Sequence, residues 1–170
     1  MRIQAVPLTA EAYSRYGDVV MAALRGEAGV VANQGTARKW PGIAPFRTTR
    51  PGATAAFSVF RSEPRATFPF AVALLEKHPC STQAFLPMNA RRFLVVVARG
   101  EDVPDLSTLA AFVATGAQGI TYHPGVWHHP MIALDAAIDF AVLVGEDGTA
   151  SDCVEHPFAE GERALVLLDG

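Results

Sequence analysis

Three of the five histidines in the chain fall within seven positions, in the stretch TYHPGVWHHP at residues 121–130. Imidazole titrates near neutral pH, so it can transfer protons or bind a divalent metal ion. The Pro-Gly pair predicts a tight turn that fixes the direction of His128. Adjacent residues on a strand face opposite ways. We therefore expect His128 to point inward, His129 to lie on the outer face, and His123 to be a turn residue.

A second group of polar residues lies in LLEKHPCSTQAF, at residues 74–85. Glu76 and His78 are two positions apart, which places both side chains on one face of a strand. Lys77 between them should face the opposite way. Gln83 follows a turn that contains proline and can return along a neighbouring strand. A carboxylate, an imidazole and a carboxamide could thus converge with His128 on one site for proton transfer or metal binding.

Short apolar runs divided by turn residues must position these side chains. Residues 54–62 alternate between apolar and polar side chains, as a strand with one buried face does. Residues 93–98, FLVVVA, are apolar without a break, which predicts a strand covered on both faces. Many short strands at such spacing predict a mainly β fold, a sandwich or a barrel. The middle of residues 68–78 could be strand or helix.

The N-terminal region predicts one short helix, and a long connection follows it. Thr9 is suited to cap a helix of one to two turns, and Gly17 is suited to end it in the left-handed conformation. Residues 25–53 are rich in Gly, Pro, Thr and Arg, which predicts little regular structure. A connection of this length is either a functional loop over a site or a surface loop.

Composition limits the classes of function. The chain has 170 residues, half of them hydrophobic, and a formal net charge of −3. We expect a single domain over residues 1–170 and no nucleic-acid or membrane partner. Neither a signal peptide nor a run near the roughly 20 apolar residues of a membrane span is evident, so we expect a cytoplasmic protein. Cys80 and Cys153 predict two free thiols.

The two polar stretches resemble degenerate forms of the two cupin motifs. The first cupin motif is a His-x-His pair, then Glu, then Gly before a strand. Here Glu76 and His78 fall on the His pair, Gln83 falls on the Glu, and Ala90 stands where Gly is usual.

The second cupin motif is a Pro-x-Gly turn followed by a histidine. His123 takes the Pro position here, Gly125 keeps the Gly, and His128 takes the position of the ligand histidine.

The segments STQAFLPM, FLVVVA and GITYHPGVWHHP, taken together, resemble the ureidoglycolate lyase (ureidoglycolate hydrolase) family of cupins. The resemblance implies a cupin-type double-stranded β-helix, or jelly-roll barrel, with a short N-terminal helix. It also implies a homodimer that cleaves (S)-ureidoglycolate to glyoxylate and urea in allantoin, and hence purine, degradation. Breaking the carbon–nitrogen bond needs one base and one acid, and we assign these tasks jointly to Glu76, His78 and His128.

Other polar residues are candidates for binding such a substrate. Gln83 offers a paired donor and acceptor for the ureido group. Arg61, late in the strand predicted at residues 54–62, offers a guanidinium fork for the substrate carboxylate. Asn33 and Arg38 lie in the irregular connection, where they could cover the site.

Cupins usually hold a metal ion with four ligands, and only two of those positions, His78 and His128, are histidine here. Glu76 could complete a set of two histidines and one carboxylate, which suits nickel, zinc or manganese. Gln83 is a poor ligand compared with a carboxylate. No cofactor is certain from the sequence.

Two alternatives remain open at this stage. Another small-molecule cupin enzyme, an isomerase or a metal-dependent oxygenase, would need a firm metal site, and Gln83 argues against one. A non-enzymatic ligand-binding cupin would normally accompany a DNA-binding or signalling module, and no basic helix is evident for that purpose.

Overall fold

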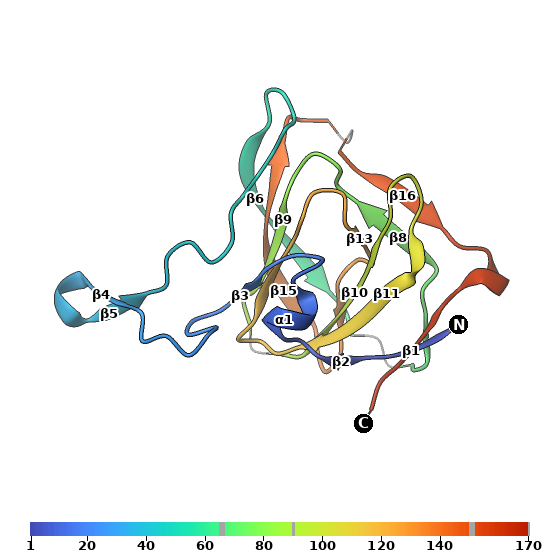
Figure 1. Ribbon diagram of the computed structural model, residues 1–170, viewed down its shortest axis with the longest axis horizontal. Helices are drawn as coiled ribbons and strands as arrows, with labels where there is room; N and C mark the ends of the chain where they lie inside the picture. The colour runs from blue at the N-terminus through green and yellow to red at the C-terminus, as the bar shows by residue number, and fades with distance from the viewer. Residues whose placement is uncertain (65–66, 90, 150–151, 170) are drawn as a thin grey trace.

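The computed structural model describes residues 1–64, 67–89, 91–149 and 152–169 (Figure 1). Within these residues, two larger sheets face each other across an apolar interior. The seven-stranded sheet has the order β16-β8-β13-β10-β11-β2, with β14 also paired to β10. Its strands are β2 (Val6–Pro7), β8 (Leu74–Lys77), β10 (Phe93–Arg99), β11 (Asp105–Ala114), β13 (Trp127–His128), β14 (Ile132–Ala133) and β16 (Val154–Pro157).

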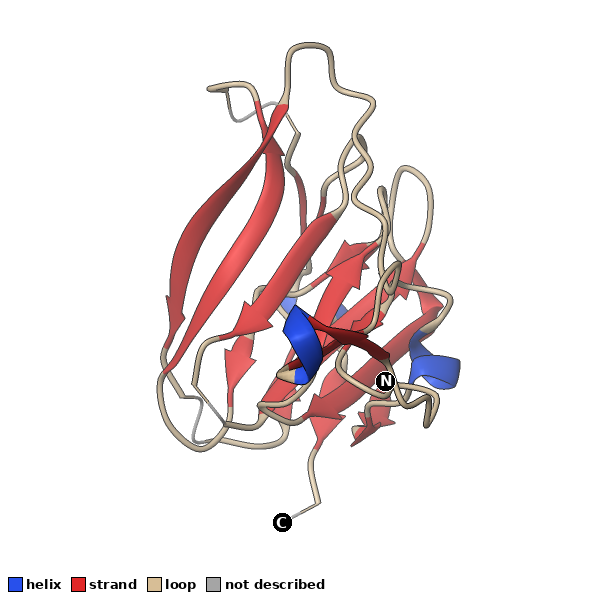
Figure 2. Ribbon diagram, turned by 90° about the vertical axis from the view of Figure 1, so that its left-hand side faces the viewer, coloured by secondary structure: helices blue, strands red, loops and turns tan. Residues whose placement is uncertain are grey.

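The five-stranded sheet has the order β3-β12-β9-β15-β6. Its strands are β3 (Val19–Val20), β6 (Thr54–Ser62), β9 (Gln83–Pro87), β12 (Gly119–Tyr122) and β15 (Ile138–Glu146). A small third sheet joins β1 (Arg2–Gln4), β17 (Leu165–Leu167) and β7 (Phe70–Ala71). Figure 2 shows that strands dominate the described chain and that its helices are short. The mainly β barrel expected from the sequence is confirmed.

Strand β10 lies between two apolar cores, as its unbroken apolar sequence predicts. Phe93, Val95 and Val97 face the barrel interior, where Phe93 meets Phe140 edge to face at 5.2 Å. The alternate residues Leu94, Val96 and Ala98 face the opposite core, which the three-stranded sheet helps to enclose. Each fully buried side chain of this size contributes about 1.5–3 kcal/mol, so β10 is a rigid support for its neighbour β13.

Helix α1 (Ala10–Tyr13) begins at the expected cap, where the Thr9 hydroxyl accepts a hydrogen bond from the backbone N–H of Ala12 at 3.2 Å. The role expected for Gly17 was wrong, because Gly17 does not adopt the left-handed conformation. It is needed instead for close packing: a Cβ at this position would lie 1.7 Å from the carbonyl oxygen of Thr121.

Residues 25–53 contain more regular structure than their composition predicts. Strands β4 (Val30–Ala32) and β5 (Ala37–Lys39) form a hairpin with the short 3-10 helix η1 (Asn33–Gly35) between them. Figure 1 shows this hairpin projecting well away from the barrel. The chain then returns to the barrel, where Thr48 bridges to Ser81 beside the start of β9.

Other local expectations are settled by the described residues. The ambiguous stretch 68–78 holds the two strands β7 and β8, and a strand that sequence patterns did not indicate, β16, pairs with β8. The 3-10 helix η2 (Glu160–Glu162) precedes β17. Ala90 lies outside the described residues. No helix in the described part of the chain is long and apolar enough to cross a membrane. Cys80 and Cys153 are free thiols.

Candidate active site

Two strands of the seven-stranded sheet bring the predicted catalytic residues together. Glu76 on β8 is directly opposite His128 on β13, although the two residues are 52 positions apart in the sequence. His78 follows the end of β8, two residues beyond Glu76. Lys77 faces the other way, with its ammonium group 4.5 Å from the centre of the Trp127 ring. The period-two alternation of the strand thus gives the arrangement that the sequence predicts.

The Pro-Gly turn sets the direction of the His128 ring. Gly125 has a φ of 80°, which glycine adopts without strain, and its N–H donates to the carbonyl of His78 at 2.9 Å. The Nδ1 atom of His128 donates to the carbonyl of Val126 at 3.0 Å. His129 lies on the opposite face, edge to face with the Phe70 ring at 5.0 Å. The opposite directions expected for His128 and His129 are therefore present.

His78 is oriented in the same way. Its Nδ1 atom lies 2.6 Å from the carbonyl oxygen of Asp152. A carbonyl can only accept, so Nδ1 carries the proton in both His78 and His128. In their neutral forms both rings therefore present the lone pair of Nε2. Both Nε2 atoms are buried and have no hydrogen-bond partner among the described residues. The two ring centres are 5.6 Å apart.

A carboxylate faces these lone pairs. Oε1 of Glu76 is 3.5 Å from Nε2 of His128. The ligand atoms of Glu76, His78 and His128 all lie within 4.8 Å of one another. Three acceptors that converge at this spacing repel one another unless a cation lies between them. That cation is either a shared proton or a metal ion.

Charge in the cluster is distributed unevenly. Burial acts to raise the pKa of Glu76, but the close contact with His128 and the charges of His128 and His78 outweigh it, so the pKa is lowered. Glu76 is therefore a weaker base than an ordinary glutamate. Burial, reinforced by the charge of His128, also lowers the pKa of His78. At neutral pH the cluster holds an anionic Glu76 and a neutral His78.

Tyr122 completes the wall of the site, and sequence patterns did not single it out. Its ring stacks on the His128 ring, with centres 3.9 Å apart and planes 10° from parallel. Burial, with the nearby charge of Glu76, raises its pKa, so it stays neutral. The inward alternation of Ile120 and Tyr122 on β12 is the signal that could have identified it.

Gln83 also lies in the barrel interior. It is buried on β9, on the same face as Phe85, and is directly opposite Tyr122 on β12. Its Oε1 atom is buried and has no hydrogen-bond partner among the described residues. The structure thus places Gln83 next to the tyrosine that covers His128, with an acceptor available for a ligand.

Arg61, by contrast, is not at the site. Its guanidinium forms a two-pronged ion pair with Asp139, with both nitrogen–oxygen distances at 2.7 Å, and its side chain is 66% exposed. The reason is the alternation of β6: Phe60 points inward to Phe85, so the next residue must point outward. The placement of Arg61 predicted from the sequence was wrong.

Asn33 and Arg38 were also placed wrongly. Asn33 begins η1 at the tip of the projecting hairpin, and Nη1 of Arg38 donates to the carbonyl of Ala28 at 3.0 Å. Both are held in a hairpin that forms its own strand pairs rather than folding over the barrel (Figure 1). Within this chain they do not cover the histidine cluster.

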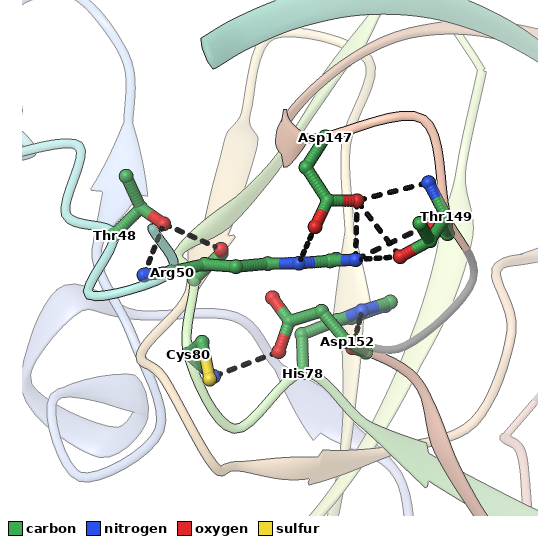
Figure 3. A network of polar contacts seen from close by, with 8 residues as sticks. Thr48, Arg50, His78, Cys80, Asp147, Thr149 and Asp152 are labelled. Atoms are coloured by element: carbon green, nitrogen blue, oxygen red, sulfur yellow. Dashed lines mark hydrogen bonds and ion pairs between the residues drawn. The ribbon is translucent and has the colours of Figure 1, made fainter. Parts of the chain in front are cut away.

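A hollow of about 130 Å³ opens beside His78. Arg50, Val144, Asp152 and Cys153 line it. Figure 3 shows His78 among the polar contacts of this region, and neither Arg50 nor Asp152 was identified from the sequence. A larger hollow of about 290 Å³ lies against the outer face of the five-stranded sheet, and none of the clustered side chains lines it. We take the smaller hollow as the access route to the cluster.

The donor set fits a divalent transition metal. Two imidazoles with buried, unpartnered Nε2 lone pairs and one carboxylate are suited to nickel, zinc or manganese. The Nδ1 hydrogen bonds to backbone carbonyls are those that usually orient metal-binding histidines. Glu76 also lies within 4.8 Å of ligand atoms of Cys153 and Glu155, but both of those residues are exposed. The set of Glu76, His78 and His128 is less exposed and is the better candidate.

Two facing, mostly antiparallel sheets that enclose two histidines and a carboxylate define a barrel of the cupin type. A family model described as ureidoglycolate lyase matches residues 1–164. The chain belongs to the ureidoglycolate lyase family, as its motifs indicate.

Named relatives agree with this family. A ureidoglycolate lyase from Pseudomonas syringae pv. syringae (strain B728a) is 39% identical over 163 residues, which cover 96% of this chain and 92% of the relative. One from Pseudomonas fluorescens (strain SBW25) is 39% identical over 160 residues, which cover 94% and 93%.

Solved structures show a more distant likeness. RmlC from Streptococcus suis, in complex with dTDP-D-xylose, has a TM-score of 0.44 and 12% identity over 57% of this chain and 46% of that chain. A dTDP sugar isomerase from Desulfovibrio desulfuricans G20 has a TM-score of 0.43 and 17% identity over 72% and 80%.

Proposed function

We propose that this chain is a lyase that cleaves (S)-ureidoglycolate to glyoxylate and urea during allantoin breakdown. The observation that carries the proposal is the convergence of Glu76, His78 and His128 inside the barrel of a chain from this family. Family membership favours a lyase over the isomerase, the oxygenase and the non-enzymatic ligand-binding protein considered above.

The reaction needs two proton transfers and breaks one carbon–nitrogen bond. Ureidoglycolate carries a hydroxyl, a carboxylate and a ureido nitrogen on one carbon. A base removes the hydroxyl proton, and the oxygen electron pair forms the aldehyde C=O bond. The C–N bond breaks, its electron pair stays on nitrogen, and an acid protonates that nitrogen to give urea. Water is not consumed, so the step is an elimination.

The cluster supplies both groups. Nε2 of neutral His78 presents a lone pair and is suited to accept the hydroxyl proton. A proton held between Oε1 of Glu76 and Nε2 of His128 is suited to protonate the departing nitrogen. Gln83 would bind the ureido group through its amide. The buried Nε2 atoms of His78 and His128 limit access of water, which favours elimination over side reactions.

The same three residues would hold a divalent ion if the protein uses one. Such an ion would act as a Lewis acid that lowers the pKa of the substrate hydroxyl. We expect glyoxylate release to continue after dialysis against a chelator, because the imidazoles and the carboxylate suffice for the proton steps. Loss of activity that nickel, zinc or manganese restores would contradict this expectation and assign the site to a metal.

Product analysis tests the function itself. Purified protein incubated with racemic ureidoglycolate should release glyoxylate and urea in equal amounts, consume only one enantiomer rapidly, and release no ammonia. Ammonia in place of urea would indicate hydrolysis of the ureido group. Glyoxylate release that is no faster with the protein than without it would contradict the lyase assignment altogether.

Two further expectations concern the setting of the enzyme. The free thiols of Cys80 and Cys153 favour a reducing compartment, which supports a cytoplasmic location. A homodimer is supported by β6, an edge strand whose outward face carries Phe57 and Val59, both more than half exposed. Light scattering should give a molecular mass twice that of one chain. Phe57→Asp should reduce this mass to that of a single chain. A monomeric wild-type protein would contradict the dimer.

A further inference from the structure

A segment distant in sequence from the catalytic cluster is attached to the chain that follows His78. The backbone N–H of Thr82 donates to the carbonyl of Arg47 at 2.8 Å, and that of Thr49 donates to the carbonyl of Cys80 at 2.9 Å. These bonds hold the backbone of Arg50 beside residues 80–82. Arg50 therefore has a fixed origin close to the site, although it follows a long and irregular connection.

The side chain of Arg50 extends from this anchor and binds the end of β15. Its Nε donates to Oδ2 of Asp147 at 2.7 Å, and its Nη2 donates to Oδ1 of Asp147 and to the hydroxyl of Thr149. Only 8% of the Arg50 side chain is exposed. A two-pronged contact at such low exposure restricts both partners more than a surface ion pair does.

Asp152 follows Thr149 by three positions in the sequence and lines the same hollow as Arg50 and His78. Its Oδ1 accepts from the backbone N–H of Cys80 at 2.8 Å, and its carbonyl accepts from Nδ1 of His78 at 2.6 Å. Asp152 is only 4% exposed. Figure 3 shows Arg50 bound to Asp147 and Thr149, and next to them Asp152 bound to Cys80 and His78. We call Arg50, Asp147, Thr149 and Asp152 the Arg50 clamp.

We propose that the Arg50 clamp is a positioning device that selects the Nδ1–H tautomer of His78 and aims its Nε2 at Glu76 and His128. Arg50 and Asp147 act through Asp152 and contact no reacting atom. Without the clamp, the Asp152 carbonyl would no longer be held at Nδ1, and the ring could rotate or bind its proton on Nε2. The effect of the Arg50 clamp on turnover rests on the lyase function proposed above.

Kinetics test the role in turnover. Arg50→Met should lower kcat by about 10- to 100-fold, as loss of groups that orient active-site histidines does, and change KM by less than about threefold. Arg50→Lys keeps the charge but loses the fork, and should recover part of the activity. Asp147→Asn should also lower kcat with little change in KM, but by a smaller factor than Arg50→Met. The matched control is Arg92→Met, which removes an exposed ion pair with Asp135 elsewhere on the barrel.

Nitrogen-15 NMR of histidine-labelled protein tests the tautomer without substrate. Wild-type His78, assigned by comparison with His78→Gln, should show a protonated Nδ1 and an unprotonated Nε2 at neutral pH. Arg50→Met and Asp147→Asn should shift the signals toward a mixture, while Arg92→Met should not. Because this NMR measurement needs no turnover, it tests the tautomer of His78 even if the lyase reaction is not observed.

Three results would overturn the proposal. The first is an Arg50→Met protein that keeps both the wild-type kcat and the wild-type His78 signals. The second is a loss confined to KM, which would make Arg50 a substrate-binding residue instead. The third applies if Arg50→Met fails to fold: Asp147→Asn would then decide, and wild-type His78 signals in that variant would refute the clamp.

Discussion

At the scale of single residues, the site depends on two imidazoles whose Nδ1 atoms are held by backbone carbonyls. Val126 holds His128, and Asp152 holds His78, so both Nε2 lone pairs meet the carboxylate of Glu76. This geometry makes the two histidines unequal to the other three in the chain. His156, for example, only packs between the rings of Trp127 and Phe158.

The adjacent pair His128 and His129 gives a direct mutational prediction. His128→Ala should cut kcat by roughly 100-fold or more, because it removes a general acid–base group. His129→Ala should change kcat only slightly, because that ring faces Phe70 on the other side of the sheet. Steady-state kinetics of the two variants is the measurement. If the effects were reversed, the inward position of His128 would have no catalytic meaning.

At the scale of elements, the Pro-Gly turn and strands β8 and β13 place the cluster, and α1 supports the strand next to it. The hydroxyl of Tyr13 in α1 donates to the carbonyl of Thr121 at 3.0 Å, and Gly17 packs directly against that carbonyl. Thr121 precedes Tyr122, whose ring covers His128. The N-terminal helix thus helps to hold one wall of the site.

Gly17 therefore gives a prediction on stability. Gly17→Ala should lower the free energy of unfolding by about 1–3 kcal/mol, because its Cβ would overlap a backbone oxygen that cannot rotate away. Gly161→Ala is the matched control, since a Cβ there meets nothing within 4 Å. Urea denaturation of both variants measures the difference. Equal free energies of unfolding for the two variants would show that the backbone at residue 17 can move to accommodate a Cβ without loss of stability.

At the scale of the whole molecule, the sequence predicts those features that follow from local periodicity. The two buried faces of FLVVVA and the opposite directions of Glu76 and Lys77 each follow from the period of a strand. The Pro-Gly turn identifies which residue begins the next strand. These local rules, together with the family motifs, were enough to name the barrel and its three central residues.

The sequence does not predict contacts that depend on how distant segments meet. Arg61 was expected to point inward, but the face it occupies depends on the pairing of β6 with β15. The sequence around Arg50 does not distinguish it from the other polar residues of an irregular connection. Its position beside His78 depends on the pairing of that connection with residues 80–82. Asp152 acts chiefly through its backbone carbonyl, which no side-chain pattern reveals.

The central claim is that Glu76 and His128 act as a single unit in the barrel, and a double-mutant cycle on kcat tests it most directly. Glu76→Gln and His128→Ala should each lower kcat by about 100-fold, and the double variant should be no more than about threefold slower than the slower single variant. Independent groups would instead multiply to a loss of about 10,000-fold. That product, or a wild-type rate in either single variant, would contradict the account.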